Sequence, residues 1–458
     1  MAKVKSKYVC QNCGYETAGY LGKCPECGAW ASFVEEVSSA DNKAIAVSLP
    51  DNNPPMKLSD IEMNTEIRTK TGISEFDRVL GGGIVQGSLV LIAGDPGIGK
   101  STILLQTSGQ LCNNGKKVLY VSAEESASQI KLRAERLKVK SDNLYIYPQT
   151  NFELIKKHIE EMQPDLVIVD SIQAIYTSII QSSAGSVSQI RECCNSLMSI
   201  AKTNNVSIIV IGHVTKEGNI AGPKVLEHMV DTVIQFEGDK YKTYRILRSI
   251  KNRFGNTSEV GIFEMGACGL TEVINPSELF LKEYNQTQTP GSTIIVTSEG
   301  TRPLLVEIQA LVGTTPYPAP RRVANGVDVS RVLQILAVLE KRIGLNLSKQ
   351  DVYVNVMGGI DVDEPSADLG VAIAVATCAR DVVVDSQTVI IGEIGLSGEI
   401  HPVNNIEKRL NEAITSGFKK AIIPFANDVP SDIKKIEIVR VKRLMDAIAA
   451  CVTPAGKS

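Results

Sequence analysis

Short apolar runs alternate with stretches of helical character between residues 60 and 272. The runs are rich in valine, isoleucine and leucine, and polar or glycine-containing turns separate them from the helical stretches. Strands that alternate with helices in this way predict a parallel sheet covered by helices on both faces. The predicted strands are 89–93, 117–121, 166–170, 206–212 and 232–236.

The same alternation returns near the C-terminus and predicts a second α/β domain. Strands are expected at 292–297, 351–356 and 389–392, and helices at 329–342 and 368–378. Two polar, irregular stretches separate the patterned regions and are typical of linkers. We therefore predict four parts: a cysteine module at 1–34, a linker at 35–59, a nucleotide-binding domain at 60–272 and a C-terminal domain at 286–458.

Composition agrees with a globular protein and excludes some classes of function. Hydrophobic residues make up 43% of the 458 residues, and the net charge is -3. Any contact with DNA must therefore come from local basic segments rather than from the overall charge. No run approaches the roughly 18 apolar residues of a membrane span, and no apolar run follows the basic N-terminus. These features predict a soluble, cytoplasmic protein with no membrane partner.

Residues 94–101, GDPGIGKS, fit the phosphate-binding pattern G-x-x-x-x-G-K-[ST] at every fixed position. The segment follows a predicted strand and precedes a predicted helix, so backbone N–H groups at the helix N-terminus favour phosphate. Lys100 is expected to reach the β- and γ-phosphates of ATP, and Ser101 to ligate Mg²⁺. The predicted nucleotide-binding residues are Gly94, Asp95, Pro96, Gly97, Ile98, Gly99, Lys100, Ser101 and Thr102.

Three further candidates lie at the carboxyl ends of neighbouring strands. Asp170 ends an apolar strand and can hold the magnesium ion. Glu124 follows the strand at 117–121 and can polarise a water molecule, although the adjacent Glu125 is explained equally well as an acid at a helix start. His213 ends the strand at 206–212 and could sense the γ-phosphate or be structural.

Two cysteine pairs near the N-terminus, each of the form C-x-x-C, predict a structural metal site. Four thiolates suit tetrahedral Zn²⁺ and leave no open coordination position, whereas two disulfides are the alternative. Gly14 and Gly28 follow the second cysteine of each pair, where a tight turn needs backbone freedom. The predicted zinc ligands are Cys10, Cys13, Cys24 and Cys27.

A basic strip covers residues 240–255, KYKTYRILRSIKNRFG, and contains no acidic residue. It could be a solvated positive face. Alternatively, Lys251 and Arg253 could contact phosphate, either in DNA or in the nucleotide of a neighbouring subunit. The loops at 177–188 and 214–227 could be movable DNA contacts or ordinary connections.

Taken together, these motifs resemble the RadA (Sms) family of bacterial DNA repair proteins over essentially the whole chain. The matching segments include GDPGIGKST, VSAEES, LVIVDSIQ and KNRFG, the last made of Lys251, Asn252, Arg253, Phe254 and Gly255. The resemblance implies a RecA-like ATPase with ATP, Mg²⁺ and Zn²⁺ as cofactors. It identifies Glu124 as the water-activating residue, Asp170 as the magnesium aspartate, and Lys251 and Arg253 as residues needed for DNA-linked ATP hydrolysis.

The family resemblance also implies partners. It suggests a hexameric ring that binds single-stranded and branched DNA and promotes branch migration together with the RecA recombinase. A replicative helicase or another repair protein is a further candidate partner.

The C-terminal part resembles the proteolytic domain of Lon, which needs a serine nucleophile and a lysine base. Ser366 falls at the serine position, but Glu407 occupies the lysine position. We therefore expect an inactive scaffold for ring assembly, with Arg321 and Arg322 either on a DNA-facing surface or as plain surface charges. A Lon-type protease and a regulatory ATPase that docks a protein through its zinc module are the alternative functions.

Overall fold

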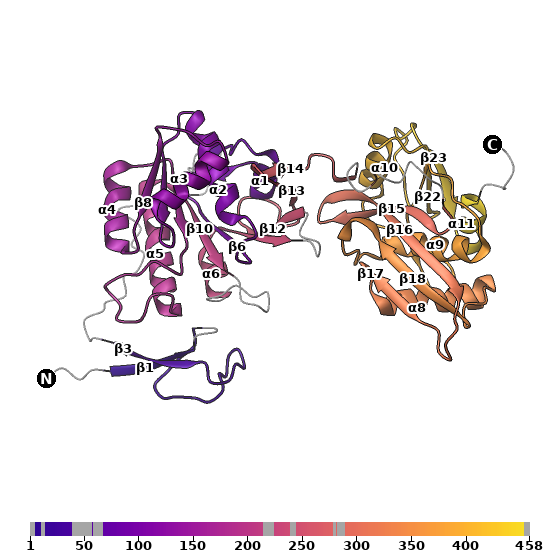
Figure 1. The fold of residues 1–458 in the computed structure, drawn as a ribbon, viewed down its shortest axis with the longest axis horizontal. Coiled ribbons are helices and arrows are strands. Elements are labelled where there is room, and N and C mark those ends of the chain that lie inside the picture. The colour runs from indigo at the N-terminus through magenta and orange to yellow at the C-terminus, as the bar shows by residue number, and fades with distance from the viewer. Residues whose placement is uncertain are drawn as a thin grey trace. The chain divides into compact units, whose positions relative to one another are not determined.

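The computed structural model describes residues 5–10, 14–38, 57, 67–213, 224–238, 244–277, 281 and 289–452. The chain divides into two compact units, Met1–Val273 and Ile274–Ser458, which Figure 1 shows in indigo to magenta and in orange to yellow. Each unit is described by itself.

The first unit is built on a nine-stranded sheet that is parallel on one side and antiparallel on the other. The predicted strands are present in its parallel part, which also contains β8, and their bounds differ by a residue or two from the prediction. The antiparallel part, β12 to β14, was not predicted. In sheet order, the strands are β14 (Gly269–Glu272), β13 (Val260–Gly266), β12 (Tyr244–Asn252), β11 (Thr232–Gly238), β6 (Leu89–Gly94), β10 (Ser207–His213), β9 (Leu166–Asp170), β7 (Val118–Ser122) and β8 (Leu144–Pro148).

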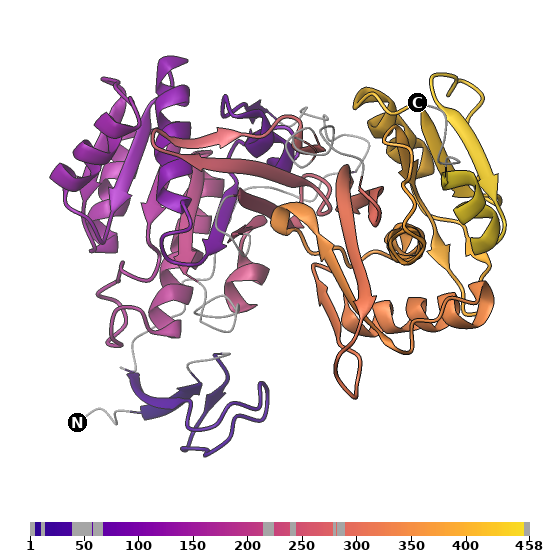
Figure 2. The ribbon, with the colours of Figure 1, turned by 45° about the vertical axis from the view of Figure 1, so that its right-hand side comes forward.

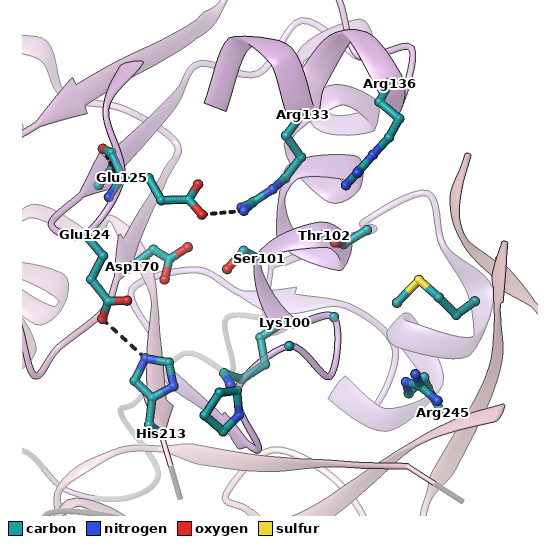
Figure 3. A pocket seen from close by; sticks show the side chains of 15 residues that line it. Lys100, Ser101, Thr102, Glu124, Glu125, Arg133, Arg136, Asp170, His213 and Arg245 are labelled. Atoms are coloured by element: carbon teal, nitrogen blue, oxygen red, sulfur yellow. Dashed lines mark hydrogen bonds and ion pairs between the residues drawn. The ribbon is translucent and has the colours of Figure 1, made fainter. Parts of the chain in front are cut away.

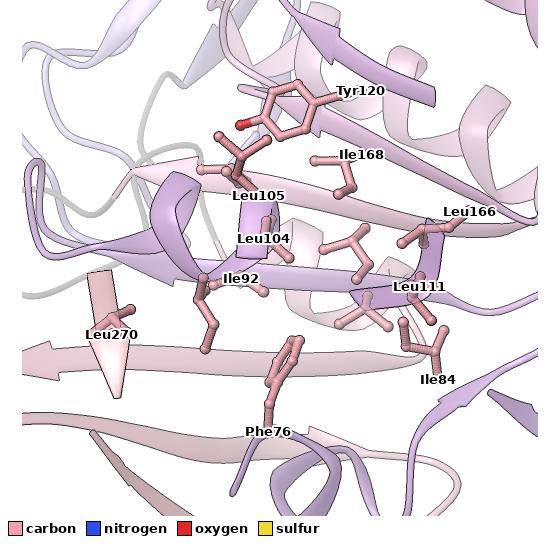
Figure 4. Close-up of a cluster of buried hydrophobic side chains, with 14 of the residues drawn as sticks. Phe76, Ile84, Ile92, Leu104, Leu105, Leu111, Tyr120, Leu166, Ile168 and Leu270 are labelled. Atoms are coloured by element: carbon pink, nitrogen blue, oxygen red, sulfur yellow. The ribbon is translucent and has the colours of Figure 1, made fainter. Parts of the chain in front are cut away.

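Alternate residues of the central strands point to opposite faces of this sheet, and each face carries its own hydrophobic core. Val90 and Ile92 of β6 pack with α1 (Ser74–Leu80), α2 (Lys100–Asn113) and α3 (Ala127–Arg136) in the cluster that Figure 4 shows. Leu89 and Leu91 pack on the other face, so the sheet is covered on both sides as predicted. The helices of that second face are α4 (Phe152–Met162), α5 (Val187–Asn204) and α6 (Lys224–Met229).

Three smaller strands form the N-terminal module, and two more precede the phosphate-binding loop. The module is an antiparallel sheet in the order β2 (Glu16–Thr17), β1 (Lys5–Cys10) and β3 (Phe33–Ser38). In the nucleotide-binding part, β4 (Arg68–Thr69) pairs with β5 (Ile84–Val85).

The second unit contains a seven-stranded mixed sheet, drawn in orange and yellow in Figure 2. Its long strand β16 was not predicted, and its central residues are almost all buried. In sheet order, the strands are β17 (Arg322–Asn325), β18 (Gln350–Val356), β16 (Arg302–Thr314), β15 (Ser292–Glu299), β19 (Thr388–Ile390), β22 (Lys420–Pro424) and β23 (Glu437–Val441).

Helices cover both faces of this second sheet. The predicted helix at 329–342 is α8 (Val329–Val338), which continues as a π-helical turn at Leu339–Ile343. The predicted helix at 368–378 is α9 (Asp368–Arg380), and it lies so close to β15 that a Cβ on Gly370 would come within 2.1 Å of Ile295. The remaining elements are α10 (Ile406–Thr415), α11 (Leu444–Cys451), the hairpin of β20 (Glu393–Ile394) and β21 (Ile400–His401), and 3-10 turns at Met357–Gly359 and Pro365–Ala367.

Candidate nucleotide site and metal module

The phosphate-binding loop lies between the end of β6 and the start of α2. Gly97 and Gly99 have φ values of 76° and 122°, which only glycine adopts readily. A Cβ on Gly94 would come within 2.5 Å of the carbonyl oxygen of Phe236, so the loop can pass this close to β11 only with glycine there. Positive φ therefore explains why residues 97 and 99 are glycines, and close packing against β11 explains Gly94.

Lys100 is nearly buried inside this loop, with 4% of its surface exposed. Its Nζ donates hydrogen bonds to the carbonyl oxygens of Gly94, at 2.8 Å, and Asp95, at 2.9 Å. Burial lowers the pKa of Lys100, and the negative charges of Asp170, Asp95 and Glu124 oppose that shift. The ammonium group is thus held at the centre of the loop, where an anion would be bound.

A pocket of about 520 Å³ opens over the loop and brings most of the predicted nucleotide residues together. In Figure 3, Lys100 and Ser101 lie in the middle, Glu124, Asp170 and His213 on one side, and Arg136 and Arg245 on the other. The predicted site residues that line it are Pro96, Gly97, Gly99, Lys100, Ser101, Thr102, Glu124, Asp170 and His213.

The two adjacent glutamates after β7 have different environments. An oxygen of Glu124 accepts a hydrogen bond from Ser171 and lies 3.3 Å from Nε2 of His213. Glu125 instead forms an ion pair with Arg133 of α3. Glu124 is therefore the glutamate that His213 and Ser171 orient, and Glu125 is neutralised by a cation.

Asp170, at the end of β9, accepts a hydrogen bond from the hydroxyl of Tyr120 at 2.6 Å. Burial and the charge of Asp170 raise the pKa of Tyr120 well above its usual value, so the tyrosine remains a donor. The other carboxylate oxygen of Asp170 and the hydroxyl of Ser101 are hard oxygen donors, which is the donor type that Mg²⁺ prefers. These two residues fit a magnesium ion.

Sequence reasoning missed five residues that line the pocket, one of which is Ser122 at the end of β7. Arg133 and Arg136 come from α3, Arg245 from β12 and Met265 from β13. Arg245 donates from Nε to the carbonyl oxygen of Ile98, at 3.0 Å, and so braces the phosphate-binding loop. The only available signal was the i, i+3 spacing of two arginines on one helix face, which is common on solvated helices.

The KNRFG segment does not line this pocket and contacts neighbouring elements of the chain. Lys251 donates to the carbonyl oxygens of Glu227, His228 and Val230, at 2.6, 3.3 and 2.9 Å, beside the C-terminus of α6. Burial and the nearby Arg253 lower the pKa of Lys251. This lysine therefore acts as a cap on the last carbonyls of a short helix.

Arg253 pairs with the buried carboxylate of Asp231 at 3.2 Å. The same carboxylate accepts a hydrogen bond from the backbone N–H of Leu89, at 3.1 Å, where β6 begins. The segment is thereby linked to the strand that leads into the phosphate-binding loop.

The rest of the KNRFG segment packs against neighbouring backbone. The amide of Asn252 donates to Leu80, the carbonyl oxygen of Phe254 accepts from Arg68 at 2.6 Å, and Gly255 lies against Gly81.

The described cations of the basic strip are not simply a solvated face, although the side chain of Arg253 is 53% exposed. Arg245, Arg248, Lys251 and Arg253 all contact protein groups; Arg248, for example, pairs with Glu237 at 2.9 Å. They belong to β12 or directly follow it, and their partners belong to neighbouring elements. Lys240 and Lys242 lie outside the described residues.

The structure describes the first of the two candidate loops and only the end of the second. The segment at 177–186 is held by the buried amide of Gln189, which donates to the carbonyl oxygens of Thr177, Ile180 and Ser182. Residues 214–223 lie outside the described part of the chain, and residues 224–229 form α6 rather than loop.

Three of the four predicted zinc ligands come together in the N-terminal module. The sulfur atoms of Cys10, Cys24 and Cys27 all lie within 4.8 Å of one another, and Cys10 and Cys27 are 3.7 Å apart. Two thiolates on one tetrahedral zinc ion would be about 3.8 Å apart, whereas a disulfide needs about 2.05 Å. Cys13 lies outside the described residues. The donor set fits zinc and does not fit a disulfide between these cysteines.

Two matching turns place the cysteines. The N–H of Gly14 donates to the carbonyl oxygen of Cys10 at 2.8 Å, and the N–H of Gly28 to that of Cys24 at 3.0 Å. Both glycines have positive φ, 77° and 72°, as the sequence pattern predicts. The same turn, closed by a glycine N–H, therefore starts at Cys10 and at Cys24.

In the C-terminal unit, the residue that faces Ser366 is not the one that the sequence suggested. Glu407 is exposed on α10, and the side chain that reaches Ser366 is that of Arg409, with Nη1 3.2 Å from Oγ. Arg409 is fully buried, pairs with Glu364 and donates to the carbonyl oxygen of Val296 at 2.6 Å. A guanidinium does not lose its proton, so it cannot serve as the base of a serine–lysine pair.

Comparison with known proteins agrees with the three parts of the chain. Residues 8–35 match the family described as "Rubredoxin metal binding domain", residues 53–219 match "AAA domain", and residues 327–427 match "Subunit ChlI of Mg-chelatase". The chain is also 52% identical over 453 residues to DNA repair protein RadA of Bacillus subtilis, and the match covers 98% of this chain and 99% of the relative. The chain belongs to the RadA family of DNA repair proteins.

Other members of the RadA family are similar over the same length. The proteins of that name from Halalkalibacterium halodurans and Streptococcus pyogenes are each 51% identical, with 98% of this chain covered and 99% and 100% of the relatives. The predicted architecture is thereby confirmed: a zinc ribbon, a P-loop ATPase domain and a C-terminal domain of the Lon-like type. Within the described residues, no helix combines the length and apolar character that crossing a membrane requires.

Proposed function

We propose that this protein is a DNA-stimulated ATPase that acts on branched recombination intermediates and promotes branch migration during RecA-dependent repair. The observation that carries the proposal is the pocket in which Lys100, Asp170 and Glu124 surround one space over the phosphate-binding loop. Membership of a family of DNA repair proteins supports DNA as the polymer on which the energy of hydrolysis is used.

In this proposal the chain's own residues divide the work of ATP hydrolysis. Lys100 and the N–H groups of the loop bind the phosphates, and Glu124 accepts a proton from the attacking water. His213, 3.3 Å from Glu124, orients that carboxylate and reports on the γ-phosphate. Ser101 and Asp170 would hold Mg²⁺, which supplies charge neutralisation at the β- and γ-oxygens when it is bound.

We further propose that KNRFG couples the pocket to DNA from within the subunit. Lys251 caps α6, which directly follows residues 214–223, and these in turn follow His213 at the end of β10. Arg253 is connected through Asp231 to the start of β6. A change at either end of this network is transmitted to the other because its members are directly bonded.

The test is ATP turnover with and without single-stranded DNA. Wild-type protein is expected to hydrolyse ATP faster with DNA, and Lys251→Ala is expected to lose most of that stimulation, because three carbonyl groups near α6 lose their donor. Lys157→Ala, an exposed change on α4, is the matched control. Turnover that does not respond to DNA in the wild type would count against the proposal.

We also propose that the Lon-like domain has no peptidase activity and serves ring assembly, as a hexamer, and DNA contact. The support is Arg409, a permanently charged group at the position from which a base would act on Ser366. Casein that is degraded by wild-type protein but not by Ser366→Ala would contradict this assignment.

A further inference from the structure

The nucleotide pocket extends beyond the phosphate-binding loop, and this far end has a different chemical character. Glu124, Asp170 and His213 lie on one side of Ser101, and Figure 3 shows Arg136 and Arg245 on the other, beyond Thr102. Met265 also lines the far end, since a Cβ on Gly99 would come within 2.9 Å of its Cε. The far end therefore offers cations and a thioether, whereas the carboxylates that face metal and water lie on the other side.

The order of the loop residues indicates which part of ATP lies there. Phosphates bound by Lys100 and Ser101 lie over the start of α2, with the terminal phosphate toward Glu124 and His213. The rest of the nucleotide must then extend the other way, past Thr102 toward Arg136 and Met265. The pocket volume of about 520 Å³ leaves room for a group as large as a nucleotide.

No phenylalanine, tyrosine or tryptophan is among the residues that line the pocket, all of which the structure describes. A planar base at this end cannot stack on one of those rings. The planar group available is the guanidinium of an arginine, which stacks on aromatic faces, and the neighbouring soft group is the sulfur of methionine.

Of the two arginines at this end, only Arg136 is available. Arg245 is 8% exposed and is held by the carbonyl oxygens of Ile98 and Tyr244. Arg136 is exposed and makes no hydrogen bond or ion pair with any other residue that the structure describes. It is the last residue of α3, and that helix is anchored by a capping box at Ser126 and by the buried Ile130.

We propose that Arg136 stacks on the adenine base of the bound nucleotide and that Met265 contacts the base beside it. This inference rests on the proposed ATPase site and assigns its base-binding part. Arg136 is a positioning residue: it holds the base and makes no contact with the reacting phosphate.

The test uses the full-length protein and compares ATP with a ligand that has phosphates but no base. Arg136→Ala is expected to raise the KM for ATP about tenfold and to leave kcat within about twofold, because a cation–π contact affects binding rather than the chemical step. Inhibition by inorganic tripolyphosphate is expected to be unchanged. Arg136→Tyr restores a planar group without the charge and is expected to recover most of the affinity for ATP.

The matched control is Lys131→Ala, which removes an exposed positive charge from the same helix without touching the pocket. If Arg136 binds phosphate instead of the base, Arg136→Ala will weaken the binding of tripolyphosphate as much as that of ATP. Arg136→Lys will then restore the affinity for both ligands, and Arg136→Tyr will not. That outcome, or an unchanged KM in Arg136→Ala, overturns the base-stacking assignment. A wild-type protein that neither binds nor hydrolyses ATP would instead remove the proposed function on which the assignment rests.

Discussion

At the residue scale, the adjacent Glu124 and Glu125 show how local contacts separate two identical side chains. The sequence places both at the end of the same strand. Only the family resemblance favours Glu124 over Glu125 as the water-activating residue. In the structure, Ser171 and His213 contact Glu124, whereas Arg133 pairs with Glu125. Glu125 is thus held by a cation, whereas Glu124 lies beside His213.

We therefore expect the two glutamates to respond differently to the same substitution. Glu124→Gln should lower kcat by about 10²–10⁴-fold, with little change in ATP binding, because it removes the proton acceptor and keeps the shape. Glu125→Gln is the matched control and should keep kcat within about tenfold, since it removes only the pair with Arg133. Steady-state kinetics with measured ATP affinity decide between them, and an equal loss of kcat in both variants would refute the distinction.

The contact between Ser366 and Arg409 could not be predicted by matching sequence motifs. Matching the motif placed Glu407 at the position of the base, but residues two apart on a helix point about 200° away from each other. Packing of α10 on the sheet decides which of them is buried, and Leu410 and Ala413 set that face. The motif match located the segment, whereas the identity of the inward residue depended on the tertiary contact.

At the scale of elements, the uniformly apolar parallel strands of the first unit could be predicted, whereas its antiparallel strands could not. The parallel strands of the first unit, such as β9, are buried along almost their whole length. Strand β12 alternates buried and partly exposed residues: Arg248 and Lys251 are partly exposed, whereas Arg245 is buried. Its basic residues resembled a surface segment in the sequence, although β12 lies inside the antiparallel extension of the sheet, between β11 and β13.

The zinc module is the element whose stability depends most directly on one interaction. Among the described residues of the module, its hydrophobic cluster consists of Cys10, Cys24 and Phe33, packed against Tyr8, so the metal must supply much of the folding free energy. Cys27 is exposed, and replacing it removes a ligand without opening a cavity in a core.

We expect Cys27→Ser to lose its zinc, from about one ion per chain to well below one, and to expose residues 14–38 to proteolysis. Metal analysis and limited proteolysis measure the two effects, and Cys268→Ser, which removes an exposed cysteine outside the module, is the control. ATP binding by Cys27→Ser should be retained, because none of the cysteines lines the nucleotide pocket. Full zinc retention would contradict the ligand assignment.

At the scale of the whole molecule, the sequence leaves open whether KNRFG acts in its own subunit or across a subunit interface. The contacts of Lys251 with the carbonyl groups near α6, and of Arg253 with Asp231, argue for its own subunit. Both side chains are occupied by partners that belong to the same fold. An interfacial role would first require those hydrogen bonds to break.

A mixing experiment tests this conclusion. Lys100→Ala removes the phosphate-binding lysine and Lys251→Ala removes the cap, so each variant alone should show little DNA-stimulated ATP turnover. If Lys251 worked across an interface, a pocket in a Lys251→Ala subunit could use the intact lysine of a Lys100→Ala neighbour. About a quarter of the sites in a random mixture would then recover. Because Lys251 caps a helix of its own subunit, we expect no recovery when the two variants are mixed, whereas energy transfer between labelled subunits should show that mixed assemblies form.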